Sequence, residues 1–321
     1  MAAGRTGASG VLVASGPWDP QPWADAVRRL DPNRAVHIWP DLPDPDAVGY
    51  VLAWHPPPEA LASLPNLAAI FSLGAGVEHI LSRPLPPGVP LARIVSEDLT
   101  DRMVEWVVLQ VLMHHRQQRH YDRLQRAHRW HELPQPAASA VRVGVMGMGV
   151  IGARSAEMLA RLGFQVAGWS RRPKAVAGIE AFHGAEGLDA FLARTDILVV
   201  LLPLTPGTRG LLAMPLFRKL ARDGALGGPV LVNAGRGGLQ VEADIAAAIG
   251  DGTLAGASLD VFETEPLDPA SPLWDLKDVI VTPHCAGWSD PAELARQIVD
   301  QIAAFEAGRP LRNLVDRDAQ Y

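Results

Sequence analysis

The chain has a single cysteine, Cys285, among 321 residues. One thiol cannot form an intramolecular disulfide, which is typical of proteins from a reducing compartment. Long hydrophobic runs are also missing. The longest apolar stretch, residues 197–202, is far shorter than the roughly 20 residues that a membrane-spanning helix needs. The early apolar run at 11–14 is too short for a signal-peptide core. We therefore expect a soluble cytoplasmic protein with no membrane partner.

The sequence also lacks a long block of one charge sign, an internal repeat and a low-complexity tract. Its net charge of −6 argues against nucleic acid as a partner. Hydrophobic residues make up 48% of the chain, which is ample for buried cores, and the length predicts two domains. We expect no bound metal ion.

The first hundred residues alternate short apolar runs with helical patterns, which predicts a small α/β domain with a parallel sheet. The turn Leu73-Gly74-Ala75-Gly76 follows a predicted strand, where open α/β sheets bind ligands. Its successive backbone N–H groups could hold a carboxylate. The alternative is an ordinary strand-to-helix turn. Trp54 also follows a strand, and either lines a cleft or packs in the core.

Residues 96–132 have the pattern of one long helix and its extension, with apolar spacing first and a basic, aromatic second half. A nucleic-acid-binding helix is the weaker interpretation, because acids such as Asp122 interrupt the basic residues. We expect Trp106, Tyr121 and Trp130 to be exposed, which suits an interdomain or subunit contact.

The stretch VRVGVMGMGVIG, residues 141–152, predicts a strand, a glycine turn and a helix start. Glycines spaced in this way in this context bind the pyrophosphate of a dinucleotide at a helix N-terminus. A glycine triplet alone is weak evidence, so the rest of the chain must support it. We assign the whole turn to cofactor binding: Gly147, Met148, Gly149, Val150, Ile151 and Gly152.

Residues 141–288 repeat strand and helix, which predicts a doubly wound parallel sheet. The strand after the glycine turn should end in the residue that contacts the cofactor's ribose, and NAD-binding sites have an acidic residue there. This chain has Ser170, Arg171 and Arg172 there. Arginine forks match a 2′-phosphate, so we predict NADP(H) as the preferred cofactor and NAD(H) as the alternative. The alternative is that these residues form a solvent-exposed basic turn with no role in binding.

Three later strand ends carry chemically useful side chains. Arg236 lies between glycines, carboxylates follow at Asp260 and Glu265, and His284 ends the last strand. Individually these have ordinary readings: a surface arginine, an acidic loop, a capping histidine. Together they bring a cation, a carboxylate and an imidazole to one edge of a sheet. Cys285 beside His284 suggests a thiol nucleophile, but the arginine and glutamate make that interpretation poor.

With these motifs in order, the chain resembles the D-isomer-specific 2-hydroxyacid dehydrogenases, and among them the glyoxylate/hydroxypyruvate reductases. The motifs that carry the resemblance are LGAGVE, GMGVIG, LLPLTPGTRG, VNAGRGG, LAGASLDVFETEPL and TPHCAG. Arg236 and Glu265 are 29 positions apart, and Glu265 and His284 are 19 apart, which matches the family's spacing. The resemblance extends over almost the whole chain.

The resemblance implies roles for the catalytic residues. Arg236 binds the substrate carboxylate and polarises its carbonyl, while His284 protonates the oxygen as hydride arrives at C2. Glu265 orients the imidazole and favours its charged form. A fixed cation and a proton donor suit a reaction that develops negative charge on oxygen.

The resemblance also implies binding contacts. The backbone N–H groups of Ala75 and Gly76 grip the substrate carboxylate, and Asp260 lies by the nicotinamide carboxamide. The remaining cofactor contacts implied by the motifs are Leu202, Pro203, Thr208, Ala234, Gly235 and Gly287, together with Arg236 and His284.

The family's fold implies two Rossmann-like or flavodoxin-like α/β domains with a cleft between them. The substrate domain comprises residues 1–99 plus 290–321, and the NAD(P)-binding domain comprises 100–289. Closure of the cleft then excludes water. A homodimer through the helical region 100–132 is expected.

The leading hypothesis is NADPH-dependent reduction of a small 2-keto acid, of the glyoxylate or hydroxypyruvate type, to the D-2-hydroxy acid. One alternative is the same chemistry on phosphoglycerate or a bulkier substrate. The other is a non-enzymatic, dinucleotide-sensing protein like the corepressors that share this fold.

Overall fold

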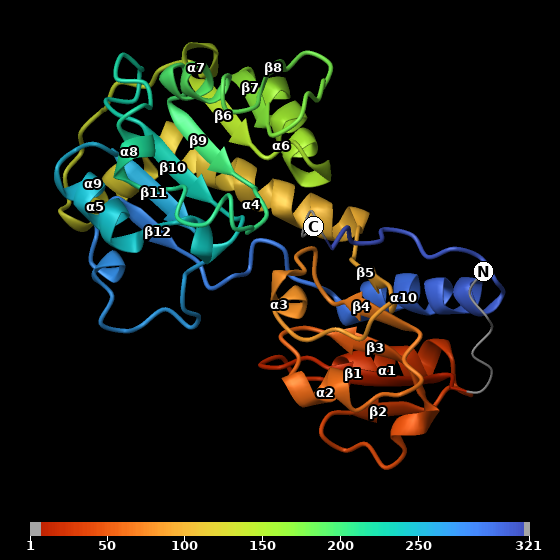
Figure 1. The fold of residues 1–321 in the computed structure, drawn as a ribbon. Helices are drawn as coiled ribbons and strands as arrows, with labels where there is room; N and C mark the ends of the chain where they lie inside the picture. The colour runs from red at the N-terminus through yellow and green to blue at the C-terminus, as the bar shows by residue number, and fades with distance from the viewer. Residues whose placement is uncertain (1–7, 318–321) are drawn as a thin grey trace. The chain divides into compact units, whose positions relative to one another are not determined.

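The computed structural model describes residues 8–317, which form two compact units (Figure 1). The first unit comprises the described residues up to Leu99 together with those from Ser289 onward, and the second comprises Thr100–Trp288. Each unit has its own parallel sheet, so the predicted α/β class is confirmed. Which unit binds the substrate and which binds the cofactor stays a prediction.

The sheet of the first unit has five parallel strands in the order β2-β1-β3-β4-β5. Both faces are covered by helices, so its central strands are continuous apolar runs rather than alternating ones. This strand order is the flavodoxin-like one. The strands are β1 (Gly10–Ala14), β2 (Val36–Ile38), β3 (Val48–Ala53), β4 (Ala69–Ser72) and β5 (Leu91–Ala92).

Helices from distant parts of the sequence cover this sheet. Helices α1 (Gln21–Leu30) and α10 (Pro291–Glu306) pack on one face, and α2 (Pro58–Ala62) and α3 (Glu78–Leu81) on the other. The side chain of Asp290 caps α10 by accepting the N–H of Ala292, and proline follows at the first helical position. A 3₁₀ turn spans Pro45–Ala47.

The sheet of the second unit has seven parallel strands in the order β12-β11-β10-β9-β6-β7-β8. The order reverses between β6 and β9, and such a switch point opens a crevice at the carboxyl ends of the strands. The edge strand β8 is exposed and lacks the apolar pattern of the others. The strands are β6 (Arg142–Met146), β7 (Gln165–Ser170), β8 (Glu180–His183), β9 (Ile197–Val200), β10 (Val230–Asn233), β11 (Gly256–Leu259) and β12 (Val279–Val281).

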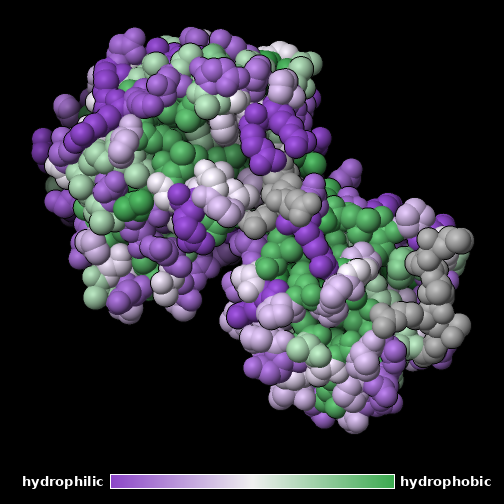
Figure 2. Space-filling view, viewed as in Figure 1, coloured by the Kyte–Doolittle hydropathy of each residue, from purple (hydrophilic) through white to green (hydrophobic). Residues whose placement is uncertain are grey.

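Two apolar cores lie on the two faces of this sheet. Helices α4 (Glu97–His115) and α6 (Val150–Arg161) contribute to one core. Helices α7 (Leu188–Ala193), α8 (Met214–Phe217) and α9 (Glu242–Gly250) contribute to the other. On the visible face of each unit, hydrophilic residues surround the hydrophobic ones (Figure 2). Short 3₁₀ turns occupy Ala138–Ala140, Gly237–Leu239 and Pro272–Trp274. Within the described residues, no helix is both long and apolar enough to cross a bilayer.

The region predicted as one long helix is two helices. Gln117 adopts a left-handed conformation, with φ of 56°, and separates α4 from α5 (Gln118–Arg126). Trp130 lies beyond the end of α5 and is fully exposed. The expectation that Trp106 is exposed was wrong, because its side chain packs into the core beneath α4 and the residue is only 8% accessible.

One face of α4 carries polar side chains that bond to the sheet. Trp106, Gln110 and His114 are spaced by four residues and therefore share a face. Trp106 donates to Thr282, and Gln110 accepts from the Ser258 hydroxyl at 2.8 Å. Nε2 of His114 lies 2.9 Å from the same hydroxyl. These bonds fix α4 against β11 and the end of β12.

Acidification should destabilise the second unit through His114. Burial lowers the pKa of this imidazole from 6.5 to about 4, and the Arg119 charge adds to this while Asp278 opposes it. Below pH 6.5 the imidazole therefore binds a proton in the unfolded chain but not in the folded protein. The free energy of unfolding falls as the pH drops from 6.5 towards 4. The expected loss between pH 7.5 and 5 is about 2 kcal/mol.

Urea unfolding at the two pH values, compared between the wild type and His114→Gln, isolates this contribution. Glutamine can still bond the Ser258 hydroxyl but does not titrate, so the variant should lack that part of the pH dependence. The exposed His183→Gln is the matched control and should behave as wild type. Equal pH dependence in all three proteins would contradict the assignment.

Candidate active site

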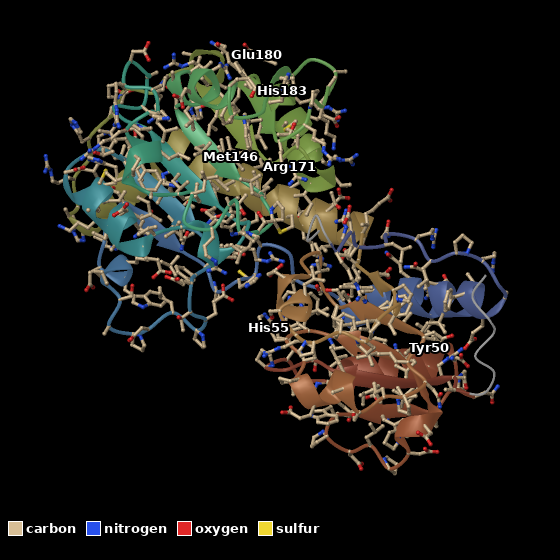
Figure 3. All side chains as sticks on the ribbon, viewed as in Figure 1. Tyr50, His55, Met146, Arg171, Glu180 and His183 are labelled. Carbon is tan, nitrogen blue, oxygen red and sulfur yellow. The ribbon has the colours of Figure 1, made fainter. Side chains whose placement is uncertain are left out.

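The sequence-predicted residues of the second unit lie at one edge of its sheet. Because all seven strands are parallel, their carboxyl ends share this edge. Met146, at the end of β6, and Arg171, after β7, are labelled there in Figure 3. The residues that end the strands or lie within three positions beyond them are Gly147 (β6), Ser170 (β7), Leu202 (β9), Arg236 (β10), Asp260 (β11) and His284 (β12).

The glycine turn between β6 and α6 is shaped by close backbone contacts. Gly147 has φ of 107°, a conformation that L side chains rarely adopt. A Cβ on Gly152 would lie 1.9 Å from the carbonyl oxygen of Gly147, so the helix start can approach the turn only because the side chain is absent. A Cβ on Gly149 would meet nothing within 4 Å. The turn therefore leaves open space at Gly149, beside the N-terminus of α6. Met148, Val150 and Ile151 complete the turn.

The turn after β7 presents two arginines to solvent. The Ser170 hydroxyl donates to the carbonyl of Arg172 at 2.7 Å, which closes the turn. Arg171 and Arg172 are both exposed. A positive segment thus lies next to the glycine turn, because β7 is the neighbour of β6.

Two further loops follow strands at the same edge of the sheet. After β9, the Thr208 hydroxyl donates to the Pro203 carbonyl at 2.8 Å, while Leu202 is buried against the core. After β10, the N–H of Gly235 donates to the Asn233 side chain at 3.0 Å. Ala234 is buried beside it, whereas Gly287 follows the turn after β12 and is partly exposed.

Glu265 and His284 form a hydrogen-bonded pair. His284 Nδ1 lies 2.7 Å from Glu265 Oε2, and the backbone N–H of Phe262 donates to Glu265 Oε1 at 2.9 Å. Burial by itself would raise the pKa of the Glu265 carboxyl. The hydrogen bond and charge of His284, with the Phe262 bond and the charge of Arg236, lower it below its usual range. The carboxylate is therefore ionised near neutral pH and can orient the imidazole through Nδ1.

Arg236 supplies the cation at this edge. It lies between two buried glycines, its own side chain is partly buried, and Nη1 donates to the Gly235 carbonyl at 2.7 Å. That bond, to the residue directly before it, fixes one edge of the guanidinium. Its charge acts on Glu265, so the cation belongs to the same electrostatic group as the carboxylate and the imidazole.

Asp260 binds the turn that carries His284. The residue is only 1% exposed, and burial raises the pKa of its carboxyl while hydrogen bonds oppose the rise. Its Oδ1 accepts the N–H of Cys285 at 3.0 Å, and its Oδ2 accepts the N–H of Ala286 at 2.9 Å. A contact between Asp260 and the nicotinamide stays a prediction, whereas these bonds within the protein are explicit.

The predicted carboxylate-binding turn lies in the first unit, directly after β4. The Ser72 hydroxyl donates to the Gly76 carbonyl at 2.9 Å and accepts the N–H of Gly74 at 3.3 Å. Among the described residues, no protein acceptor takes the N–H of Ala75 or Gly76. These two groups are therefore available to an anion, and Leu73 anchors the turn in the core.

Trp54 supports this turn rather than standing open to solvent. A Cβ on Gly74 would lie 2.3 Å from the Trp54 ring, so glycine is needed where the indole passes. Trp18 stacks on the indole with ring centroids 4.3 Å apart, and the His79 ring lies 4.2 Å away. With only 6% of Trp54 exposed, its direct contact with substrate stays a prediction.

Residues 108–286 match the protein family described as "D-isomer specific 2-hydroxyacid dehydrogenase, NAD binding domain". The chain belongs to the D-isomer specific 2-hydroxyacid dehydrogenase family. The predicted resemblance is thereby confirmed.

Relatives in this dehydrogenase family match nearly the whole chain. Glyoxylate/hydroxypyruvate reductase A of Escherichia fergusonii is 41% identical over 305 residues, which cover 93% of this chain and 96% of that protein. The crystal structure of an NADPH-dependent glyoxylate/hydroxypyruvate reductase from Sinorhizobium meliloti, in complex with NADP and sulfate, is 47% identical. It has a TM-score of 0.93 and covers 97% of this chain and 100% of its own.

A second solved dehydrogenase of the family, from Xanthobacter autotrophicus Py2, was crystallised in complex with NADPH and MES. It is 41% identical, has a TM-score of 0.91, and covers 98% of this chain and 100% of its own. Similarity at this level extends through both units of the present chain.

Several polar residues of this dehydrogenase form bonds that the sequence does not predict. Trp106 and Thr282 bond to each other and lead to Asp260, and Ser72 shapes the turn of the first unit. Thr282 directly precedes Pro283 and His284, and this adjacency is the signal that could have identified it. Trp106 has no comparable local signal, because its partner is 176 positions away.

Proposed function

We propose that this protein is an NADPH-dependent reductase that converts a small 2-keto acid, of the glyoxylate or hydroxypyruvate type, to the D-2-hydroxy acid. The observation that carries the proposal is the Glu265–His284 pair, 2.7 Å apart, at the strand edge that also carries Arg236. The relatives with reductase names, at 41% and 47% identity, support it. We place the enzyme in the cytoplasm, which the single cysteine supports.

Arg236 and the turn after β4 are the groups that we assign to substrate binding. The Arg236 guanidinium would bind the substrate carboxylate and the keto oxygen, since its planar fork suits such oxygens. The N–H groups of Ala75 and Gly76 in the first unit, which no protein acceptor takes among the described residues, are the other donors that we assign to a substrate carboxylate. As negative charge grows on the keto oxygen, the fixed Arg236 cation would stabilise it more strongly than in the ground state.

Proton delivery falls to His284. Its Nδ1 is engaged by Glu265, which leaves Nε2 as the nitrogen that would donate a proton to the keto oxygen. The ionised Glu265 carboxylate would stabilise the imidazolium form that carries this proton. Holding donor and cation on strand ends limits their motion, which lowers the entropic cost of reaching the transition state.

The residues present fit an NADP(H) cofactor. The open space at Gly149 and the N-terminus of α6 would receive the pyrophosphate, and Arg171 and Arg172 would face the 2′-phosphate. Leu202, Pro203, Thr208, Ala234, Gly235, Asp260 and Gly287 would border the remainder. When bound, NADPH supplies the hydride that the substrate carbon receives.

A substrate panel assayed with both cofactors tests the proposal. Purified protein should oxidise NADPH with glyoxylate and hydroxypyruvate faster than with bulky or phosphorylated 2-keto acids. The rate is followed by the loss of nicotinamide absorbance. Protein that oxidises neither NADPH nor NADH with any member of the panel would contradict the enzyme assignment. Faster turnover of a bulky substrate would overturn only the substrate class.

Removing the two arginines after β7 should weaken NADPH binding selectively. In Arg171→Ala/Arg172→Ala, the KM for NADPH should rise about 10- to 100-fold, because charge-assisted bonds to a phosphate are lost. The KM for NADH, which has no 2′-phosphate, should change little. Steady-state kinetics with each cofactor measures both values.

Arg161→Ala provides the matched control for this pair, since it removes an exposed arginine at the end of α6 in the same unit. It should leave both KM values near those of the wild type. An equal rise in KM for NADPH and for NADH in the double variant would mean that the arginines do not bind the 2′-phosphate.

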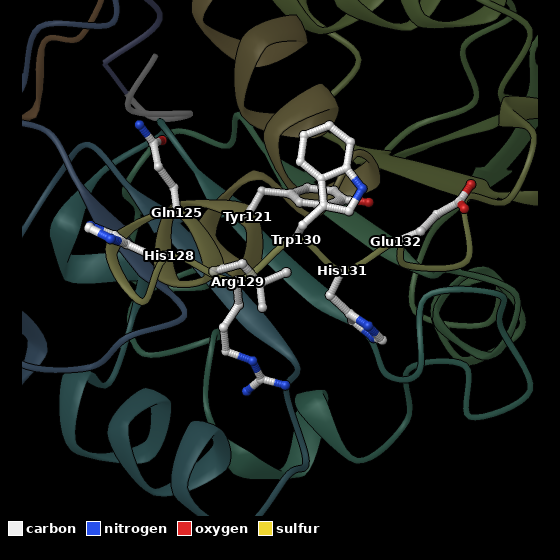
Figure 4. A pocket seen from close by; sticks show the side chains of 8 residues that line it. Tyr121, Gln125, His128, Arg129, Trp130, His131 and Glu132 are labelled. Atoms are coloured by element: carbon white, nitrogen blue, oxygen red, sulfur yellow. The ribbon is translucent and has the colours of Figure 1, made fainter.

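We further propose a homodimer formed through residues 100–132. Leu109 on α4 is 53% exposed, and the fully exposed Trp130 borders a hollow of about 790 Å³ (Figure 4). Apolar side chains exposed in one region favour a protein partner. The hollow is lined by Tyr121, Leu124, Gln125, His128, Arg129, Trp130, His131 and Glu132.

Light scattering during size-exclusion chromatography should give twice the 34.4 kDa mass of the chain. Leu109→Glu should shift this mass towards the monomer, because a charge buried in an apolar interface is costly. Leu162→Glu, which alters an exposed leucine outside the region, is the control. A monomeric wild type would exclude the dimer. A Leu109→Glu variant that remains dimeric would show that the interface lies outside this region.

A further inference from the structure

Trp106 and Thr282 form a hydrogen-bond series that ends on Asp260. The indole Nε1–H of Trp106 donates to the Thr282 hydroxyl oxygen at 3.2 Å, and that hydroxyl donates to Asp260 Oδ1 at 2.5 Å. Trp106 and Asp260 are both buried. Because the indole can only donate, the Thr282 proton is directed towards the carboxylate.

The receiving carboxylate holds the backbone around His284. Asp260 accepts the N–H groups of Cys285 and Ala286 through its side chain, and its carbonyl oxygen accepts the N–H of His284 at 2.8 Å. One residue thus binds three consecutive backbone donors. The position of His284 relative to β11 is fixed by these bonds rather than by packing alone.

His284 needs such support because its backbone is strained. Its φ is 51°, a left-handed conformation that is unfavourable for a non-glycine residue. A strained conformation persists only where its surroundings over-determine it. The direction in which the imidazole leaves the backbone depends on this conformation, and so does its approach to Glu265.

Burying the negative charge of the Asp260 carboxylate costs free energy. Burial raises the pKa of this carboxyl, and the hydrogen bond from Thr282 is the largest of the effects that oppose the rise. A protonated Asp260 would lose part of its capacity to accept the N–H groups of Cys285 and Ala286. The Thr282 hydroxyl, aligned by Trp106, therefore helps to keep the carboxylate in its accepting form.

We propose that Trp106 and Thr282 are positioning residues for the proton donor. Acting in series through Asp260, they hold His284 in its left-handed backbone conformation. Neither residue needs to touch the substrate. The inference rests on the proposed reductase function and extends it to a residue of α4, outside the strand ends that carry the other groups.

Kinetics of Thr282→Val, Thr282→Ser and Trp106→Phe test the proposal. Valine keeps the shape of threonine without the hydroxyl, and kcat should fall about tenfold, the equivalent of one hydrogen bond to a charged group. Serine restores the hydroxyl and should restore kcat. Trp106→Phe should lower kcat about threefold, since only the alignment is lost. In each variant, KM for the keto acid and for NADPH should stay within about twofold of the wild type.

The series arrangement has its own signature. The double variant Trp106→Phe/Thr282→Val should be no slower than Thr282→Val alone, because the indole acts only through the hydroxyl. Trp274→Phe is the matched control: it also removes an indole bond, the one from Nε1 to the Asp268 carbonyl at 2.9 Å. It should leave kcat unchanged.

A second measurement does not depend on activity. In protein labelled with ¹⁵N-tryptophan, the Trp106 indole proton, assigned by its absence in Trp106→Phe, should exchange with solvent faster in Thr282→Val than in the wild type. This measurement remains informative if Thr282→Val loses activity through poor folding. Exchange of the Trp106 indole proton can then be measured in Thr282→Ser, where it should stay as slow as in the wild type.

The outcomes separate the two proposals. A wild type that reduces no 2-keto acid overturns the proposed function, whatever the variants do. An active wild type with unchanged kcat in Thr282→Val and Trp106→Phe overturns the positioning role. So does a loss of kcat that serine fails to restore, because packing rather than the hydroxyl would then be responsible.

Discussion

Replacing His284 with alanine is expected to lower kcat by about 10²- to 10⁴-fold, the range that a positioned general acid contributes. The imidazole is the group held by Glu265 at 2.7 Å, and its removal would take away the proposed proton donor to the keto oxygen. KM for NADPH should change little. Steady-state and single-turnover kinetics with glyoxylate or hydroxypyruvate measure the loss.

Glu265→Gln separates orientation from proton donation. The amide can still accept a bond from Nδ1 but brings no charge, so kcat should fall less than in His284→Ala. The double variant should be no worse than His284→Ala, because Glu265 acts through the imidazole. A His284→Ala protein with wild-type turnover would remove this residue from the mechanism.

Replacing Arg236 with alanine is expected to lower kcat/KM for the keto acid by about 10³-fold or more. One substitution removes both the proposed partner of the substrate carboxylate and the proposed cation for the developing oxyanion, and each such interaction contributes several kcal/mol. The loss should appear in KM and in kcat together. Binding of NADPH, measured by its fluorescence, should remain.

Arg236→Lys distinguishes charge from geometry. Lysine keeps the positive charge but lacks the planar fork, so it should recover only a small part of the lost kcat/KM. Added guanidinium ion should partly rescue Arg236→Ala and should have no such effect on the wild type. Arg218→Ala, an exposed arginine of the same unit, is the control. Full activity in Arg236→Lys would show that the fork is not needed.

Much of this architecture follows from local patterns in the sequence. The fully buried strands are continuous apolar runs, and the glycines at 147, 149 and 152 indicate a turn that has a positive φ at Gly147, open space at Gly149 and close backbone packing at Gly152. Arg236, Glu265 and His284 lie at or just beyond strand ends, and parallel strands bring their carboxyl ends to one edge. These inferences need only short-range periodicity and the rules of parallel sheets.

Other features required the packed structure. The region 96–132 has the periodicity of one helix, yet Gln117 breaks it, because a single left-handed residue leaves no trace in hydrophobic spacing. Trp106 is equally apolar whether it faces solvent or a core. Only the packing of α4 against the sheet decides that it is buried and that its indole reaches Thr282.

The sequence by itself determined the class of fold, the glycine turn after β6 and the three residues proposed for catalysis, because each depends on contiguous residues or on a fixed order of motifs. Tertiary structure alone decided how His284 is held. The bonds from Trp106 through Thr282 to Asp260, and from Asp260 to the backbone of 284–286, join segments up to 176 positions apart. Such bonds depend on the side chains' final positions, which no local pattern specifies.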